Sequence, residues 1–240
     1  ILKFLFFLSI MLCSSAWSNC KISIQDFDMD SKNEVKMENM FLSLTFKPSK
    51  GGTLVNFVHK TTGNEYTGDF IGNVGGMLQD MDWEHPWEEQ EFITKEYNYE
   101  IIKDTPDEAI LHMWAKGQQI FKFITIHKTI HLYKNYSNFY VDYEIHNDSE
   151  AMSPTRFALW LHNIAFPQNQ KAVFYWTTPK GIEEKLYDNR STTGDLWNFQ
   201  PVRGWTGFIG ERGANLACSV SYKDVYAFYN WFSIDCASLE

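Results

Sequence analysis

Three residues that could bind or react with a ligand alternate along one short stretch of the sequence, namely Arg156, Trp160 and His162. Because successive side chains of a strand point to opposite faces, these three would share one face of an extended chain, and the apolar residues between them would share the other. A cation, an indole and an imidazole on one face indicate a ligand surface, since the ring can stack on a sugar and the imidazole can transfer a proton. The alternative is that all three pack beneath a second layer of the fold.

The most charged and aromatic segment is 80–92, in which carboxylates such as that of Asp80 are interspersed with Trp83, His85 and Trp87. A loop with two indole platforms and carboxylates between them suits a sugar, because the apolar C–H faces stack on the rings and the hydroxyls bond to the acids. Two alternatives remain open at this point. One is a hard-metal site built from carboxylate oxygens, and the other is a solvated acidic loop whose tryptophans tuck under it.

Other patterns that could carry chemistry are weaker. His127 and His131 would share a strand face, but they are four positions and therefore about 13 Å apart, which is too far for one metal ion, so we expect ordinary polar-face residues. Asp142 and Glu144 would lie about 7 Å apart, a spacing compatible with glycoside hydrolysis, although carboxylates are common on strand surfaces. The glycine-rich segment 70–79 lacks the ending of a phosphate cradle. These patterns therefore predict no metal site and no cofactor.

Arg156, Trp160 and His162 lie within residues 120–166. This stretch contains three long alternating runs separated by short polar turns. Such runs are typical of an antiparallel meander. In the first run, an apolar face that extends from Ile124 to Leu132 is interrupted by Lys128, and in the second run residues 139–145 alternate without interruption. The first two runs are expected to be scaffold for the third.

The rest of the chain also has the patterns of strands and turns, with no long amphipathic helix. We expect residues 21–35 to be a polar leader and residues 179–204 to be a long polar loop. The fold class is therefore an all-β, antiparallel β-sandwich of about 10–13 strands. Further strands are predicted at 36–47, two within 48–68, and then at 97–102, 109–115, 172–178, 204–210, 215–222 and 227–235.

Length and charge narrow the class of partner. With 240 residues, of which 44% are hydrophobic, the chain can bury one large core. Aromatic residues make up 17% of it, which suits strands and a surface that stacks on ring-shaped ligands. The net charge of −9 and the absence of any Lys/Arg run argue against nucleic acid as a partner. An acidic protein also repels polyanions, so a neutral sugar or glycan is the expected partner.

Residues 1–18 have the composition of a signal peptide, with an early cation, an apolar run and a small-x-small end that a signal peptidase could cut before Asn19. The apolar run is shorter than the roughly 20 residues of a membrane span, so we expect no integral span after cleavage. An uncleaved anchor is the alternative. The remaining chain, 19–240, is expected to be a single domain that is secreted or periplasmic, where export would allow a disulfide between Cys218 and Cys236.

Several short motifs follow one another along the chain, namely 51–55 (GGTLV) with 62–65 (TGNE), the hairpin 128–149, 159–163 (LWLHN), 204–208 (GWTGF) and 215–218 (NLAC). Together they resemble the galactose mutarotase-like supersandwich superfamily, which includes aldose 1-epimerases. The resemblance covers residues 36–235 and implies a supersandwich that binds or acts on sugars. Similar domains also occur within glycoside hydrolases and polysaccharide lyases, so the resemblance implies the fold more strongly than the reaction.

In the epimerases of that superfamily, a histidine acts as general acid at the ring oxygen and a glutamate late in the chain acts as base at the anomeric hydroxyl. The resemblance implies the acid role for His162. A matching base is missing, because Glu211 lies in a predicted turn and Glu240 is the last residue. The chain is also short for a complete supersandwich, so we expect the domain to continue beyond Glu240.

The sequence therefore favours a secreted carbohydrate-active or carbohydrate-binding protein with His162 as its candidate catalytic acid. The alternative is a non-catalytic glycan-binding accessory module of a larger glycoside hydrolase or polysaccharide lyase, which the missing base favours. A purely structural surface protein is a third reading, but it leaves the aromatic excess unexplained. The predicted sugar contacts are Arg156, Trp160, Trp83, His85, Trp87 and Trp205.

Overall fold

The computed structural model describes backbone and side chains for residues 19–67, 76–81, 90–148, 171–188, 204–210 and 215–220. It describes the backbone alone for Asp82, 159–164, 194–198, 228–232 and 238–239. Within these ranges the chain is almost entirely β-structure, apart from one helical turn, α1 (Glu91–Thr94), and one 3-10 turn (Gln119–Phe121). The predicted signal peptide lies outside the described residues.

Two large antiparallel sheets dominate the fold. The first has the strand order β1-β2-β3-β4-β5, and its strands are β1 (Lys21–Gln25), β2 (Glu34–Glu38), β3 (Leu42–Lys47), β4 (Thr53–His59) and β5 (Asn64–Glu65). The second has the order β10-β9-β8-β7, with β7 (Asn98–Asp104), β8 (Glu108–Lys116), β9 (Ile124–Tyr133) and β10 (Phe139–Asn147).

Three smaller sheets complete the described structure. One has the order β18-β11-β6, with β6 (Gln79–Asp82), β11 (Leu159–Ile164) and β18 (Ser238–Leu239). Another has the order β13-β12-β15-β16, with β12 (Lys171–Thr178), β13 (Gly181–Asp188), β15 (Trp205–Gly210) and β16 (Asn215–Ser219). The last pairs β14 (Gly194–Asn198) with β17 (Phe228–Phe232).

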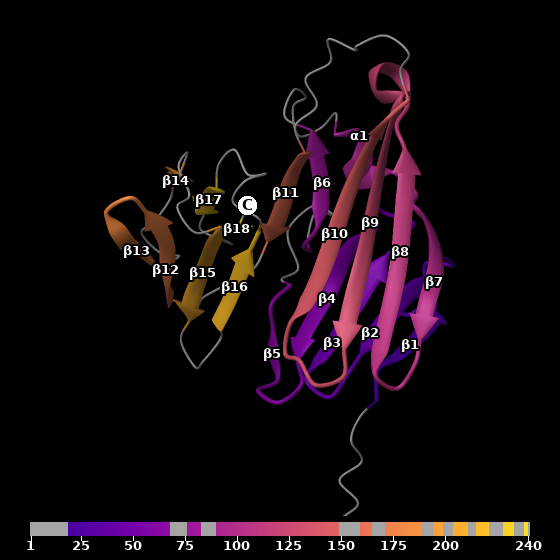
Figure 1. The fold of residues 1–240 in the computed structure, drawn as a ribbon, viewed down its shortest axis with the longest axis horizontal. Helices are drawn as coiled ribbons and strands as arrows, with labels where there is room; N and C mark the ends of the chain where they lie inside the picture. The colour runs from indigo at the N-terminus through magenta and orange to yellow at the C-terminus, as the bar shows by residue number, and fades with distance from the viewer. Residues whose placement is uncertain are drawn as a thin grey trace, which may run out of the picture.

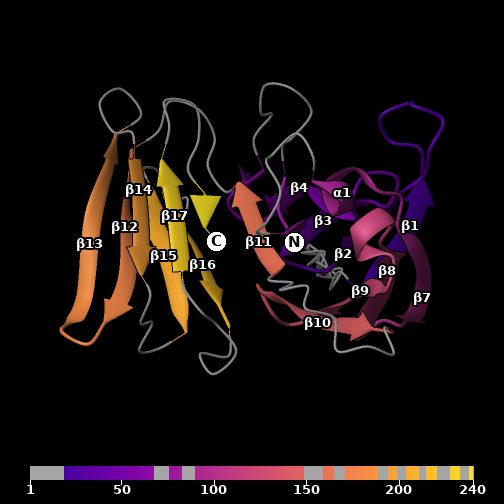
Figure 2. The same ribbon diagram turned by 90° about the horizontal axis from the view of Figure 1, so that it is seen from above.

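The two large sheets pack face to face as a sandwich, with β1 to β4 behind β7 to β10 in Figure 1 and the same two layers seen from above in Figure 2. Strict alternation produces this core. Every second residue of β8 is buried, and so is every second residue of β9 from Ile124 to Leu132. Each fully buried Leu or Ile contributes about 1.5–3 kcal/mol to folding. The predicted all-β antiparallel sandwich is confirmed.

The smaller sheets β12 to β17 stand beside this sandwich (Figure 1). Phe174 and Phe208 belong to the same buried cluster as the sandwich core. In addition, the Tyr66 hydroxyl after β5 donates a hydrogen bond to the carbonyl of Asn215 at 2.9 Å. Cys218 is a free thiol, and Cys236 lies outside the described residues. None of the helices in the described ranges is long and apolar enough to cross a membrane.

The central hairpin agrees with its prediction. β9 and β10 pair antiparallel from Ile124 opposite Asn147 to Leu132 opposite Phe139. The predicted third strand of the meander does not continue that sheet, however, because β11 pairs with β6 and β18. Sequence alternation predicts strands and their faces but not the neighbour that each strand selects across a long connection.

Three other predictions are wrong. Residues 21–35 are not a leader, since they contain β1, which pairs with β2. Residues 36–47 are not one strand, because the Asn39 side chain accepts hydrogen bonds from two backbone N–H groups and turns the chain between β2 and β3. Residues 179–204 contain β13 and β14 rather than a continuous loop. β1 and β13 are edge strands with mostly exposed side chains. The sequence of β13 lacks hydrophobic alternation, and that of β1 alternates only at Ile22 and Ile24. The described residues form eighteen strands instead of 10–13.

Lys128, the cation in the apolar face of β9, is completely buried. Its ammonium group donates to Asp80 Oδ2 at 2.8 Å and to the carbonyls of Gly51 and Leu78 at 2.9 and 3.0 Å. All three of its donors are therefore used. The ammonium also lies 4.7 Å from the centroid of the Tyr97 ring, within the range of a cation–π contact.

Asp80 on β6 is also completely buried, and it accepts hydrogen bonds from two tyrosines in addition to that from Lys128. We refer to these four side chains as the Asp80 cluster. The Tyr97 hydroxyl donates to Asp80 Oδ2, and the Tyr143 hydroxyl donates to Oδ1 at 3.1 Å. Burial lowers the pKa of Lys128, and the neighbouring Asp80 opposes that shift. Because a buried charge is costly unless it is paired and hydrogen-bonded, this network fixes β6 against β9 and β10.

The glycine before β4 shows how closely the backbone approaches this cluster. Gly51 has φ of 67°, and a Cβ there would lie 2.5 Å from the carbonyl oxygen of Ile93. Only glycine therefore fits where the Gly51 carbonyl accepts its hydrogen bond from Lys128.

The two phenols of the cluster lead to a pH prediction. Burial, reinforced by the charge of Asp80, raises the pKa of Tyr97 and of Tyr143 well above the usual 10. Since the folded-state pKa exceeds the unfolded one, this contribution to stability is complete below pH 10 and is lost as the pH rises further, by up to about 1.4 kcal/mol per pH unit for each phenol. In an ultraviolet titration we expect two of the twelve tyrosines to ionise only on unfolding, and Tyr97→Phe to remove one of them. Ionisation of every tyrosine near pH 10 in protein that is still folded would contradict this.

Candidate functional site

The structure describes only part of the site that the sequence predicts. Arg156, Trp83, His85 and Trp87 lie outside the described residues, so their roles stay predictions. Trp205 is the first residue of β15 and is partly buried. It therefore has an exposed portion that a ligand could reach, but its role as a sugar platform also stays a prediction.

Trp160 and His162 lie on β11, for which the backbone is described, and they stand opposite Met81 and Gln79 of β6. Between these two residues, β6 carries Asp80, whose buried bonds to Lys128 and two tyrosines fix the strand. The segment that holds the predicted imidazole and indole is thus hydrogen-bonded to a rigid neighbour. A rigid scaffold is what a binding or catalytic group requires.

The same bonds overturn one part of the prediction for residues 80–92. Asp80 does not present its carboxylate to a ligand, because both of its oxygens are buried and accept hydrogen bonds from within the protein. The interspersed carboxylates of this segment predicted a ligand loop or a solvated acidic loop, whereas Asp80 belongs to a strand whose described side chains are all buried.

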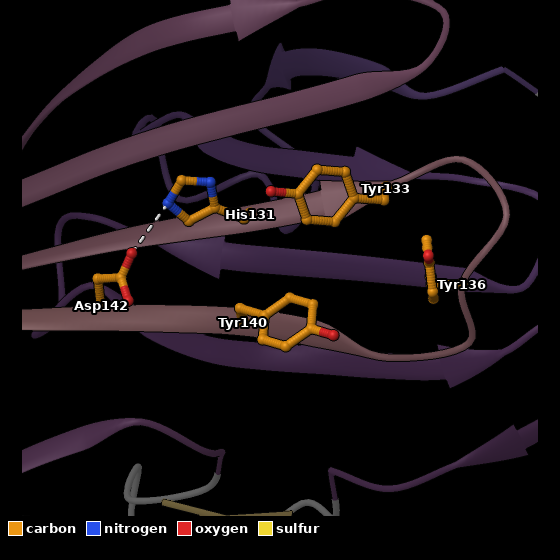
Figure 3. A pocket seen from close by; sticks show the side chains of 5 residues that line it. All are labelled: His131, Tyr133, Tyr136, Tyr140 and Asp142. Atoms are coloured by element: carbon orange, nitrogen blue, oxygen red, sulfur yellow. Dashed lines mark ion pairs between the residues drawn. The ribbon is translucent and has the colours of Figure 1, made fainter. Parts of the chain in front are cut away.

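Among the described residues, an open pocket of about 470 Å³ lies on the outer face of the second large sheet, where β9 turns into β10 (Figure 3). His131 and Tyr133 come from β9, Tyr136 from the turn, and Tyr140 and Asp142 from β10. The strand residues share the outer face because alternate residues of β9 face the core. The hairpin register then places Tyr140 directly opposite His131.

Three tyrosine rings form the aromatic part of this pocket. The centroid of the Tyr133 ring lies 6.1 Å from that of Tyr136 and 6.1 Å from that of Tyr140, with the planes at 72° and 73°. Tyr136 and Tyr140 are 55% and 50% exposed. Exposed phenols offer an apolar face for stacking and a hydroxyl for hydrogen bonding, which is the combination that a ring-shaped polar ligand needs.

His131 forms the polar part of the pocket together with acidic neighbours. Its Nε2 lies 3.2 Å from Asp142 Oδ2, the ion pair drawn in Figure 3, and its Nδ1 lies 3.9 Å from Glu108 Oε1. A hydrogen bond from Lys103 holds the pKa of Glu108 below its usual range. Desolvation, followed by a hydrogen bond to Glu108, raises the pKa of Tyr133. The pocket therefore combines charged acceptors with neutral phenols, and these can bond sugar hydroxyls.

Asn39, in the turn between β2 and β3, supports the pocket from beneath. It is fully buried, and its Nδ2 donates to the carbonyls of Tyr133 and Tyr136 at 2.7 and 2.8 Å. Its Oδ1 accepts from the N–H groups of Phe41 and Leu42 at 2.8 and 2.7 Å. A single side chain thus ties the turn that carries Tyr136 to the opposite sheet.

A row of histidines continues this outer face away from the pocket. His112 Nε2 and His127 Nδ1 lie 3.1 Å apart, and the rings of His127 and His146 are 4.6 Å apart between centroids. Glu100 Oε1 lies 3.0 Å from the other ring nitrogen of His112. Burial, followed by the neighbouring His146 and His112, lowers the pKa of His127. His127 thus contacts His112 and His146, whereas His131 contacts Asp142 and Glu108.

Sequence reasoning missed the three tyrosines of the pocket. Alternation placed His131 and Tyr133 on the polar face of the first run, but the role of Tyr136 depends on the shape of the turn at 134–138. The hairpin register was the signal that could have identified the pocket, because it brings Tyr140 opposite His131. A polar strand face becomes a site only when its cross-strand partners are known.

Comparisons with known proteins place this geometry in a sugar-related context. The profile of the family described as alpha-amylase/4-alpha-glucanotransferase, C-terminal, matches residues 69–194. The match spans more than half of the chain and includes every residue that lines the pocket. No curated protein sequence matches the chain significantly.

Several solved structures share the fold. A TPR-domain containing protein from Parabacteroides distasonis aligns with a TM-score of 0.61 and 9% identity, over 87% of this chain and 42% of that one. The 4-alpha-glucanotransferase from Thermococcus litoralis aligns with a TM-score of 0.52 and 14% identity, over 92% and 38%. A galactose mutarotase-like protein from Clostridium acetobutylicum aligns with a TM-score of 0.55 and 10% identity, over 92% and 88%. The predicted galactose mutarotase-like fold is confirmed, and this chain spans about two fifths of the length of the first two proteins.

Proposed function

Because the chain belongs to the family of alpha-amylase/4-alpha-glucanotransferase C-terminal domains, we propose that it binds a sugar or glycan as a domain of a carbohydrate-active protein. The observation that carries this proposal is the pocket with Tyr133, Tyr136 and Tyr140 along one side and the His131–Asp142 pair beside them. Stacking surfaces next to charged hydrogen-bonding groups match the two kinds of surface that a sugar ring presents.

The family description suggests the class of sugar. It names an alpha-amylase and a 4-alpha-glucanotransferase, so a linear α-1,4-glucan such as maltoheptaose is the first ligand to examine. Such a chain is uncharged, which suits a protein with a net charge of −9. An open pocket on a sheet face also suits an extended chain, because it leaves both ends of the ligand free.

The proposal includes export of the protein. The early cation, short apolar run and small-x-small end of residues 1–18 support a signal peptide, and a secreted or periplasmic domain would meet polymeric glycans. N-terminal sequencing of the exported protein should then begin at Asn19. A start at or before residue 5 would instead indicate that the segment is retained as an anchor.

Truncation of the pocket tyrosines tests the binding function. We expect Tyr140→Ala to weaken maltoheptaose binding about 10-fold and Tyr136→Ala/Tyr140→Ala about 30-fold or more, because each change removes an exposed stacking ring. Isothermal titration calorimetry would measure both, after a glycan array has ranked other sugars. Phe123→Ala is the matched control, since Phe123 is a 41% exposed ring just before β9, at the far end from the pocket. Equal losses in the control, or unchanged binding in the double variant, would refute the pocket assignment.

Catalysis at His162 is the second candidate function, with Arg156, Trp160 and the other predicted contacts around the sugar. One observation favours it: β11, which carries Trp160 and His162, is paired with β6, and the Asp80 cluster fixes β6 in place. Polarimetric epimerase and reducing-sugar assays on wild type and His162→Ala separate the two functions. Turnover that His162→Ala abolishes would establish an enzyme, whereas binding without turnover would support the accessory module.

A further inference from the structure

The loop between β1 and β2 gathers carboxylates that the sugar-binding proposal does not use. Asp26, Asp28 and Asp30 occupy alternate positions, and Glu34 opens β2 four residues later. One carboxylate oxygen from each of Asp26, Asp28 and Glu34 lies within 4.8 Å of the others. Like charges at this distance repel, so a neighbouring cation would stabilise the arrangement.

Backbone hydrogen bonds hold the loop in this shape. The N–H groups of Asp30 and Ser31 donate to the two oxygens of Asp26 at 3.1 and 3.0 Å, and the N–H of Lys32 donates to Asp30 Oδ1 at 2.8 Å. Met29 and Ser31 have φ of 61° and 69°, which is uncommon for residues other than glycine. Acidic residues at alternate positions are a feature of loops that wrap around Ca²⁺. A tight turn at the sixth residue, which is Ser31 when Asp26 is counted as the first, is another.

Glu34 gives an independent indication of a bound ion. Its side chain is only 2% exposed, and while Oε2 accepts a hydrogen bond from the N–H of Phe27, Oε1 is buried without any hydrogen bond. The same carboxylate belongs to the cluster with Asp26 and Asp28. A buried carboxylate oxygen without a donor is costly, and a metal ion would satisfy it.

Lys47 on β3 supplies part of the missing positive charge. Its ammonium pairs with Asp28 and lies 2.7 Å from Asp30 Oδ2, but it is 3.8 Å from Glu34 Oε1, beyond hydrogen-bonding distance. Burial lowers the pKa of Lys47, yet the bonds to Asp28 and Asp30 outweigh it and raise the pKa to about 12. One ammonium faces three carboxylates, and Asp26 adds a fourth to the loop, so negative charge remains in excess.

There is also space for the water ligands that a hard cation keeps. Asp28 and Glu34 border a second open cavity of about 470 Å³, together with Phe27, Lys36 and Asn56. Ca²⁺ takes 6–8 oxygen ligands in flexible geometry, and the smaller Mg²⁺ demands a near-ideal octahedron. A loop with carboxylates on one side and an open cavity on the other does not impose an octahedron, so it suits the larger ion.

We propose that the loop between β1 and β2 is a Ca²⁺ site, in which Asp26, Asp28, Asp30 and Glu34 supply the protein oxygens. Lys47 occupies part of the same charged space and acts as a competing internal cation. Binding of Ca²⁺ moves the Lys47 ammonium away from Asp28 and Asp30 and gives Glu34 Oε1 a partner. The ion therefore stabilises the β1–β2 hairpin at the edge of the first large sheet.

Calcium titration of the full chain, first stripped with a chelator, tests this site. We expect calorimetry to give a Kd between about 10⁻⁵ and 10⁻³ M, and saturating Ca²⁺ to raise the thermal midpoint by about 5 °C. Asp28→Asn should weaken binding at least about 10-fold, because it removes a charged ligand but keeps a similar shape and an acceptor oxygen. Asp107→Asn is the control, because its side chain is 88% exposed and lies in a different turn.

The variant Lys47→Met distinguishes a loop that binds Ca²⁺ from a loop whose carboxylates are only ion-paired with Lys47. If Lys47 competes with the metal, this variant should bind Ca²⁺ about 10-fold more tightly than wild type. Without Ca²⁺ the variant should be less stable than wild type, and added Ca²⁺ should restore the lost stability. A loss of stability that Ca²⁺ does not restore would show that Lys47 is the natural cation and would overturn the proposal. Absence of heat and of a thermal shift in wild type at millimolar Ca²⁺, or equal binding by Asp28→Asn, would overturn it as well. None of these outcomes depends on sugar binding.

Discussion

Replacement of Lys128 by methionine is expected to lower the free energy of unfolding by about 3–5 kcal/mol, because it leaves the carboxylate of Asp80 buried without its charged partner. Lys128 and Asp80 are both completely buried, and the ammonium also bonds two backbone carbonyls that would lose their donor. Methionine has a similar length, so the loss reports charge and hydrogen bonding rather than a cavity. Chemical denaturation followed by circular dichroism measures the change.

Two further variants isolate the buried pair. Lys116→Met on β8 is the control, because that lysine side chain is 58% exposed, and its effect should stay within about 0.5 kcal/mol. The double variant Asp80→Asn/Lys128→Met should lose less than the sum of the single variants, since neither buried charge is then left alone. A loss below about 1 kcal/mol for Lys128→Met would show that the pair does not hold the sheets together.

Asn39→Ala is expected to lower the free energy of unfolding by about 2–4 kcal/mol, because four backbone groups lose hydrogen bonds to one buried side chain. Those groups are the carbonyls of Tyr133 and Tyr136 and the N–H groups of Phe41 and Leu42. The same change releases the turn that carries Tyr136, so maltoheptaose binding should weaken in the protein that still folds. Denaturation and calorimetry on the same samples measure the two effects.

Two further variants, Asn39→Asp and Asn98→Ala, test whether the effect comes from the hydrogen bonds of the Asn39 side chain. Asp keeps the acceptors for Phe41 and Leu42 but removes the two donors, so its effect should be confined to the turn at Tyr136. Asn98 is an exposed residue of β7, and its removal should change neither stability nor binding. If Asn39→Ala were as stable as Asn98→Ala, the turn would not depend on this side chain.

Much of the fold can be predicted from the sequence, for reasons visible in particular elements. β9 and β10 alternate so regularly that their faces follow from the residues alone, and the short motifs were sufficient to indicate the galactose mutarotase-like fold. β13 could not be found, because an edge strand with exposed side chains needs no hydrophobic alternation, and the alternation of β1 is confined to Ile22 and Ile24. β11 pairs with β6 instead of continuing the sheet of β9 and β10. That choice depends on long-range pairing, which local sequence patterns do not contain.

The candidate site was harder to predict than the fold. Lys128 stood out as a cation in an apolar face, but its partner Asp80 lies 48 positions earlier, and only the folded chain brings the two together. The loop at Asp26 belongs to residues 21–35, which the sequence predicts to be a leader because they are polar. The tyrosine pocket requires a register, a turn and the support of Asn39, which no single stretch of sequence reveals.

We propose that a glycan binds on the outer face of β9 and β10. Mapping of amide chemical shifts by NMR during a maltoheptaose titration tests it most directly, because the measurement locates the ligand without any mutation. The proposal predicts that the largest shifts fall within residues 131–142, around Tyr133, Tyr136 and Tyr140. Shifts that are absent, or that concentrate on β6 and β11 and leave residues 131–142 unchanged, would contradict it.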